Sequence, residues 1–223
     1  MKKVFVLIIL IPAFFFTRAQ SKTEFGIILG TSYYNGDINH SQQFYSPSFA
    51  GGLIIKYNID KHLAVGLKGF YGSLSGSDSD FDNPENNFRQ ASFSTSVIDI
   101  AALVEFNFMA YSSSGFVKKN DERFTPFVFI GIGGNYVFNS SGFSNPVTIP
   151  FGLGIKYNIF DRLTLGLEWS FHKTFNDEID GVVNIQDAEN TPVIHNDDWY
   201  SFCGVSLCYK IFKEAIDCPT YNK

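Results

Sequence analysis

The sequence has no apolar run after its first twenty residues that is long enough to form a membrane helix. The early run, Val4–Phe16, follows Lys2 and Lys3 and is shorter than the roughly 18 to 20 residues that a spanning helix needs. A basic start, an apolar stretch and then Thr17-Arg18-Ala19 predict a signal peptide over residues 1–19, cleaved near Ala19. We therefore expect an exported protein.

Basic residues are also scarce, since 17 Lys and Arg stand against 22 Asp and Glu. Loss of Lys2, Lys3 and Arg18 with the signal peptide would leave 14 against 22, a net charge of −8. Nucleic acids bind basic surfaces, so we expect no nucleic-acid partner. The glycine-rich segment 131–134 lies inside a strand pattern rather than before a helix, so it does not predict a phosphate loop. We expect no cofactor.

Only three cysteines are present, Cys203, Cys208 and Cys218, so at least one is unpaired within the chain. Cys203 and Cys208 are five residues apart, which places them on opposite faces of one strand, so they are not expected to pair with each other. A Cys208–Cys218 disulfide, a bond between Cys218 and a partner protein, and free thiols all remain open.

Aromatic residues, by contrast, are abundant: they make up 17% of the chain, with 25 Phe and 11 Tyr, alongside 19 Gly. They fall in segments that alternate large apolar residues with small or polar ones, as strands of a barrel wall do. Eight such segments are expected, at about residues 23–34, 48–58, 63–73, 92–108, 124–138, 149–158, 163–172 and 199–212.

The connections between these segments alternate between short turns and longer loops, which is the plan of outer-membrane barrels. We therefore predict an all-β fold, an eight-stranded antiparallel transmembrane β-barrel of OmpA-like size, over residues 20–212. An even strand number puts both ends in the periplasm, with short turns there and long loops outside. Residues 213–223 are expected to form a periplasmic tail.

One predicted hairpin sequence occurs twice in the chain. Gly52–Tyr71 and Gly152–Phe171 lie 100 residues apart and are identical at ten of twenty positions. In an eight-stranded ring the two hairpins would lie half a turn apart. Tyr57 and Tyr157 would then mark the inner aromatic girdle, and Tyr71 and Phe171 the outer one. The repeat can be explained by duplication of a four-stranded unit. It can equally be explained by the same structural requirements acting on residues at the same depth in the membrane.

Seven charged residues fall on the inward faces of the strands: Lys56, Lys68, Asp99, Glu105, Lys156, Glu168 and Lys210. An eight-stranded interior is about filled by side chains, and a buried charge needs a partner. We expect an ion-pair network that fills the barrel, with a gated ion or proton path as the alternative.

Glu168, Ser170 and His172 share one inward face and suggest a hydrolase triad. Residues two apart on a strand are about 7 Å apart at the backbone, which is poor for a nucleophile–base hydrogen bond. We therefore expect no enzyme.

The two longest outer loops are acidic. Residues 74–87 hold four acids and residues 174–198 hold seven, with no Lys or Arg in either. Asp78, Asp80 and Asp82 have calcium-loop spacing, but Asn83-Pro84 stands where such a loop needs Gly. A hydrated, repelling cell surface is expected, with weak calcium binding as the alternative, and no metal site is predicted.

The connection 109–123 and the tail are instead mixed in charge, and they lie on the periplasmic side of the predicted barrel. This makes them the candidate contact regions for a partner protein. The candidate contact residues are Lys118, Lys119, Arg123, Lys213 and Cys218.

Several segments resemble the PorG-like outer-membrane proteins of the type IX secretion system of Bacteroidetes. The segments that carry the resemblance are Ser32–Asn39, Arg89 with Ser92-Phe93, Glu105–Phe108, Arg123–Phe127 leading to Gly131–Gly133, and Cys218-Pro219. The resemblance implies a non-enzymatic barrel of the bacterial outer membrane, embedded in its lipids. It also implies that the barrel supports secretion or gliding by anchoring a periplasmic ring, built of a lipoprotein and its soluble partner. The alternative is a small porin or a surface-binding barrel that acts through its acidic loops.

Overall fold

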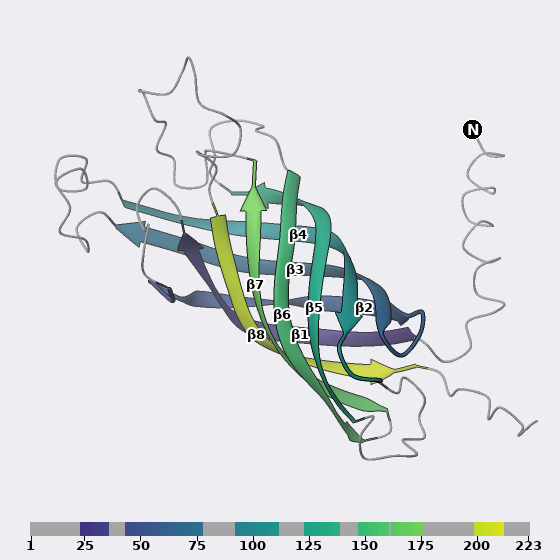
Figure 1. Cartoon of the computed structure of the whole chain (residues 1–223). Helices are drawn as coiled ribbons and strands as arrows, with labels where there is room; N and C mark the ends of the chain where they lie inside the picture. Colours follow the sequence, from purple (N-terminus) through teal and green to yellow (C-terminus); the bar gives the residue numbers. More distant parts are fainter. Residues whose placement is uncertain are drawn as a thin grey trace, which may run out of the picture.

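The computed structural model describes residues 23–35, 43–77, 92–111, 123–138, 147–160, 162–175 and 199–211. These residues form eight strands: β1 (Thr23–Asn35), β2 (Ser48–Asn58), β3 (Leu63–Ser77), β4 (Ser92–Asn107), β5 (Phe124–Val137), β6 (Val147–Phe160), β7 (Leu163–Thr174) and β8 (Trp199–Lys210). Each strand pairs antiparallel with the next, and β8 pairs with β1, so the sheet closes into a barrel (Figure 1). The predicted eight-stranded antiparallel barrel is confirmed. In the described ranges no helix is long and apolar enough to cross a membrane.

The connections divide the barrel into two ends. At one, the turn end, residues 59–62 join β2 to β3 and residues 161–162 join β6 to β7, and the longer connection 108–123 joins β4 to β5. The start of β1 and the finish of β8 also meet at the turn end (Figure 1), where Glu24 is paired in register with Lys210. The four other connections all lie at the opposite end, the loop end.

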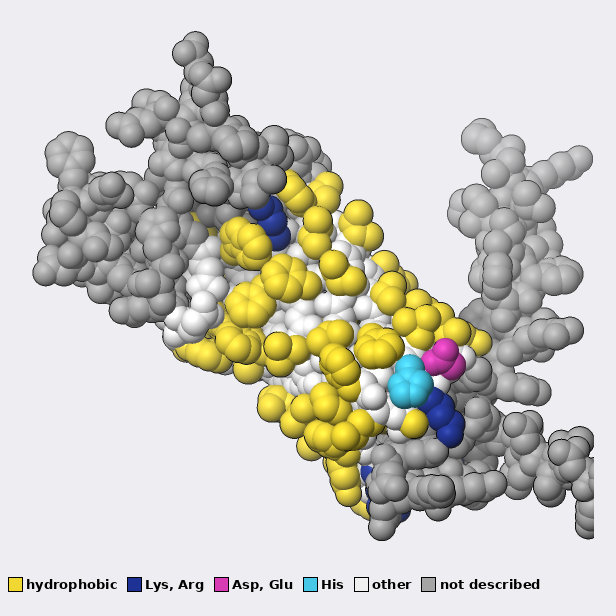
Figure 2. Space-filling model, viewed as in Figure 1, with side chains coloured by type: hydrophobic (Ala, Val, Ile, Leu, Met, Phe, Trp, Pro, Cys, Tyr) yellow, Lys and Arg dark blue, Asp and Glu magenta, His cyan; other side chains and the backbone are white. Residues whose placement is uncertain are grey.

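The outer wall is apolar around its middle. Leu67, Ile130 and Ile132 are 56%, 59% and 65% exposed, whereas the neighbouring inward side chains of Lys68 and Phe129 are buried. Figure 2 shows the resulting hydrophobic band, with the few charged side chains of the described surface near its two ends. A wall that turns its apolar side chains outward is stable in hydrocarbon rather than in water.

The two copies of the repeated hairpin, β2–β3 and β6–β7, lie on opposite sides of the ring, as predicted. β4 and β5 separate them on one side, and β8 and β1 on the other. Tyr57 and Tyr157 are 41% and 45% exposed at the turn end, and Tyr71 is 50% exposed towards the loop end. Aromatic side chains thus border the apolar wall at both ends, where they favour the membrane interface.

Glycines make room for two inward phenylalanines. Phe127 is paired in register with Gly154, and Phe129 with Gly152. A Cβ atom added to Gly154 would lie 2.5 Å from the Phe127 ring, and one added to Gly152 would lie 2.9 Å from the Phe129 ring. The phenylalanines that weaken the alternation of β5 therefore pack against bare backbone on β6.

Strand β3 is longer than expected. The pattern predicted a loop from Leu74 onward, but β3 continues to Ser77, where Ser73–Ser77 pairs with Ser92–Ser96 of β4. Leu74 continues the alternation into the interior and is fully buried. By contrast, β8 is shorter than predicted, because it ends at Lys210 instead of Phe212.

Tyr33 is an outward residue that is nonetheless fully buried. Its hydroxyl accepts a 2.7 Å hydrogen bond from Trp169 Nε1, and the Phe44 ring covers it with centroids 4.9 Å apart. Phe44 has a φ of 61°, a left-handed conformation that is uncommon for this residue type. Phe44 therefore covers part of the outer wall at the loop end.

A charge in the middle of the wall should destabilise the barrel in lipid. Leu67 lies midway between Leu63 and Tyr71 on the outward face of β3. We expect Leu67→Arg to lower the free energy of unfolding by about 2 to 4 kcal/mol, the usual cost at the bilayer midplane. Denaturant unfolding of the protein refolded into lipid vesicles measures this loss. The control Ile159→Arg, beside the turn after β6, should cost about 0 to 1 kcal/mol, and equal losses would contradict the placement of the wall.

Candidate functional site

The barrel interior holds the charged residues of the wall strands. The seven interior charges expected from the sequence are all buried there, and none is more than 7% exposed. Five of them form two ion-paired groups, while Lys210 and Asp99 lie apart from these groups and have other partners. The interior is therefore the candidate functional site.

Glu105 of β4 binds two lysines from the two copies of the hairpin. Lys56 Nζ lies 2.6 Å from Glu105 Oε2, and Lys156 Nζ donates a hydrogen bond to Glu105 Oε1. Lys56 and Lys156 are equivalent positions of the repeat. One carboxylate thus joins β2, β4 and β6, because each of its oxygens accepts from one ammonium group.

Lys68 and Glu168 form the second group, and they too are equivalent positions of the repeat. Lys68 Nζ lies 2.7 Å from Glu168 Oε1, and the two side chains are 0% and 3% exposed. The ammonium group also lies 4.8 Å from the centroid of the Phe129 ring. Because β3 and β7 are on opposite sides of the ring, this ion pair crosses the interior.

Glu24 is an interior acid that the sequence-based set omitted. It is 2% exposed, accepts a 2.9 Å hydrogen bond from Asn58 Nδ2, and is paired in register with Lys210. The alternation of the first strand already places Glu24 on the inward face, so the sequence contains the pattern that predicts its burial. With Glu24 included, four carboxylates balance four lysines among the described interior residues.

Tyr111 closes the turn end of the interior. Its side chain is 1% exposed, and its hydroxyl hydrogen-bonds to Asn158 Oδ1 at 2.9 Å and Thr164 Oγ1 at 2.6 Å. Burial raises the pKa of the Tyr111 hydroxyl well above its ordinary value, so the hydroxyl stays protonated. No alternating pattern covers Tyr111, which explains why sequence reasoning missed it.

Two interior ammonium groups also lie over the Tyr111 ring. Lys156 Nζ lies 4.2 Å and Lys210 Nζ 4.9 Å from the ring centroid, within the range of cation–π attraction. Tyr111 belongs to the connection 109–123, which the sequence predicts to be a contact region, but its own side chain is not available for contact. Its side chain packs inside the barrel because the ring and hydroxyl satisfy buried lysines and a buried asparagine.

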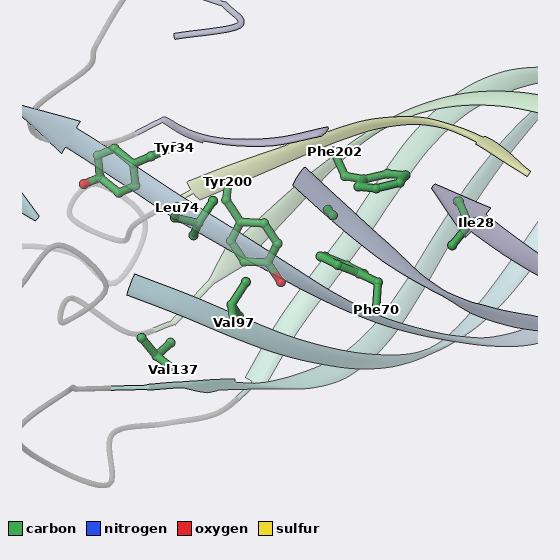
Figure 3. Packing of buried hydrophobic residues seen from close by; sticks show 9 residues of the cluster. Ile28, Tyr34, Phe70, Leu74, Val97, Val137, Tyr200 and Phe202 are labelled. Carbon is green, nitrogen blue, oxygen red and sulfur yellow. The ribbon is translucent and has the colours of Figure 1, made fainter. Parts of the chain in front are cut away.

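The loop end of the interior is aromatic instead of ionic. Figure 3 shows Phe70, Tyr200 and Phe202 gathered with Leu74 and Val97 inside the barrel. Asp99 is the acid of this region. Its Oδ2 atom accepts a hydrogen bond from the Tyr200 hydroxyl and lies 3.4 Å from His172 Nδ1.

Ser170, His172 and Asp99 lie in the order of a hydrolase triad. Ser170 Oγ is 3.2 Å from His172 Nε2, and the other ring nitrogen faces Asp99. The expectation that Ser170 and His172 lie too far apart for a hydrogen bond is wrong, because their side chains lean towards each other. All three residues are fully buried in the interior, so the Ser170 hydroxyl is not exposed on the surface of the barrel.

The predicted contact residues are only partly described. Arg123 is half-buried at the turn end, where its carbonyl oxygen accepts a 2.8 Å hydrogen bond from the Asn158 amide. The other candidates, Lys118, Lys119, Lys213 and Cys218, lie outside the described residues, as do the calcium-like acids Asp78, Asp80 and Asp82.

Two of the three cysteines are described, and both are free thiols. Cys208 is buried on the inward face of β8, and Cys203 is half-buried on the outward face. The prediction that these two do not pair with each other is confirmed. Among the described residues, no group of three or more His, Cys, Asp or Glu side chains is arranged to hold a metal ion.

An outward apolar wall, a closed eight-stranded ring and a filled interior define a small outer-membrane β-barrel. Neisserial surface protein A has a similar structure, with a TM-score of 0.53 and 10% identity, covering 85% of this chain and 97% of that chain. OprG from Pseudomonas aeruginosa aligns with a TM-score of 0.47 and 12% identity, covering 86% of this chain and 98% of that chain. The likeness to the Neisserial protein shows the fold.

The chain belongs to the family described as "Domain of unknown function (DUF6089)", which it matches over residues 2–220. No curated protein matches the chain by sequence.

Breaking the Lys68–Glu168 pair should destabilise the barrel strongly. Lys68→Met leaves the Glu168 carboxylate buried without its ammonium partner, which typically costs about 3 to 5 kcal/mol. Denaturant unfolding in detergent micelles, followed by the mobility shift of the folded barrel on gels, measures this cost.

The exchange Lys68→Glu with Glu168→Lys serves as the control. The two positions are equivalent in the repeat and face each other, so the exchange keeps one charge of each sign at the same place. It should recover most of the lost stability. If the exchanged protein is as unstable as Lys68→Met, the ion pair does not act as a local unit.

Proposed function

We propose that this chain is a non-enzymatic barrel of the bacterial outer membrane that anchors a periplasmic complex of type IX protein secretion. The observation that carries the proposal is the filled interior. From the turn end to the loop end, the interior is occupied in turn by Tyr111, the Glu105 group, the Lys68–Glu168 pair and the aromatic cluster. A barrel that is filled in this way acts through its rims and its wall.

The rim at the turn end suits a protein partner. The turn Asp60-Lys61-His62 is exposed there, and Phe108 and Met109 are 57% and 49% exposed. Exposed aromatic and Met side chains with polar groups at their rim are typical of protein interfaces. With both ends of the barrel sheet at this rim, the turn end faces the periplasm in our proposal. The proposed partners are a ring lipoprotein and its soluble partner, together with the lipids around the wall.

The candidate contact residues Lys118, Lys119 and Lys213 follow or precede strands at this rim, and they stay predictions. We expect a photo-crosslinking amino acid at each of these positions to capture the ring lipoprotein in intact cells. The crosslinked products are identified by mass spectrometry of purified outer membranes.

The control position is Phe44, which is exposed at the loop end and should give no crosslink to a periplasmic protein. A barrel whose turn-end positions capture only lipid or nothing would contradict an anchoring role. Capture from Phe44 instead would place the rim that we assign to the periplasm on the outer side.

The filled interior also distinguishes the proposed anchor from the alternative function, a small pore. We expect the wild-type protein to show no stable conductance in planar lipid bilayers, because Lys68, Glu168 and the flanking aromatic rings obstruct the interior. Reproducible single-channel steps that change when Lys56 or Lys156 is replaced would favour a pore and count against the anchor.

A further inference from the structure

Several buried polar atoms at the loop end of the interior have no hydrogen-bond partner among the described residues. They are Asp99 Oδ1, Thr148 Oγ1 and both amide atoms of the Asn135 side chain. Asp99 and Thr148 are fully buried, and Asn135 is 5% exposed. Unsatisfied buried polar atoms are rare because each loses its contacts with water on folding. Three such residues in one region, one of them a carboxylate, form a candidate ligand site.

The three residues come from adjacent strands, and all three lie near the Tyr200 hydroxyl. Asp99 of β4 is paired in register with Asn135 of β5, and Thr148 of β6 with Gly133. The Tyr200 hydroxyl, which donates to Asp99, lies close enough to interact with Thr148 and Asn135 as well. Figure 3 shows this hydroxyl pointing into the interior beside Phe70.

No lysine binds Asp99 directly. Glu105 binds two lysines and Glu168 binds one, whereas no lysine or arginine among the described residues forms an ion pair with Asp99. Lys68 lies two residues along β3 from Phe70, which is paired in register with Asp99, but its ammonium group is bound to Glu168. A buried carboxylate needs a positive charge of its own beside it.

His172 is the other group that could supply this charge. Its Nδ1 atom lies 3.4 Å from Asp99 Oδ2, a long contact for a hydrogen bond. The ring stacks on Tyr200 with centroids 4.7 Å apart and meets Phe70 edge-on, so its surroundings are mainly aromatic. Complete burial among aromatic rings disfavours the charged imidazolium form, so His172 is a poor source of positive charge for Asp99.

We infer that Asp99, Asn135 and Thr148 form a buried site for a small monovalent cation such as Na⁺. The site offers a carboxylate, an amide and a hydroxyl oxygen, which are hard ligands that suit alkali and alkaline-earth ions. A single carboxylate matches a single positive charge. The ion would join β4, β5 and β6 at the loop end, much as Glu105 joins β2, β4 and β6 nearer the turn end.

The first test compares the full-length barrel refolded in NaCl and in N-methyl-D-glucamine chloride at equal ionic strength. We expect Tm to be about 3 °C or more higher in Na⁺, because an ion that binds only the folded barrel stabilises it. Thr148→Val, which keeps the side-chain shape and removes a ligand oxygen, should abolish the difference. Asp99→Asn should abolish it too, if that variant folds.

Asn107→Ala is the matched control. Asn107 lies on the same face of β4, is fully buried, and its amide atoms also have no hydrogen-bond partner among the described residues. It lies at the turn end, so the variant should keep the Na⁺ dependence of Tm. A Tm that is equal in the two salts, or a dependence that Asn107→Ala removes and Thr148→Val does not, would overturn the site.

The second test needs no variant. Crystals of the wild-type protein grown with Tl⁺ should show an anomalous peak between Asp99 Oδ1, Asn135 Oδ1 and Thr148 Oγ1. Ordered water alone at that point, or a His172 ring moved into a hydrogen bond with Asp99 and no peak, would overturn the cation and leave an internally neutralised cluster.

Discussion

Every backbone N–H and C=O group within hydrocarbon must find its hydrogen bond inside the protein, and closure of β8 onto β1 meets this demand. The other features follow from that closure. Eight strands give a narrow ring, and a narrow ring is filled by side chains. Side chains that fill it include lysines and carboxylates that are shut off from water, so each needs a partner within reach. The ion pairs of the interior are thus a consequence of the size of the ring.

The interior changes character from one end to the other. Near the turn end, lysines, Glu24, Glu105 and the Tyr111 ring form a polar network, while near the loop end Phe70, Tyr200 and Phe202 pack together. The Lys68–Glu168 pair lies between them, with its ammonium group against aromatic rings. This order separates the ionic contacts from the aromatic ones and leaves Asp99 as the acid on the aromatic side.

The sequence predicts which side chains face inward, because strand alternation has a period of two and needs no knowledge of the neighbours. It does not predict which inward charges meet. That depends on the tilt and register of the closed sheet, which bring Lys56 and Lys156 to Glu105, and Asp99 to His172. The sequence also does not predict the inward position of Tyr111 or the burial of Tyr33. Both depend on residues outside the alternating strands, Tyr111 itself and Phe44, which pack onto the barrel.

The repeated hairpin differs at one interior position where identity would be harmful. Position 68 carries a lysine and position 168 a glutamate, and these two side chains meet across the ring. A ring built from two copies of the first hairpin would set two lysines against each other, and two copies of the second would oppose two glutamates. The difference therefore disfavours a ring of two identical halves, so a copy of either half made alone has an electrostatic reason to remain without a partner of its own kind.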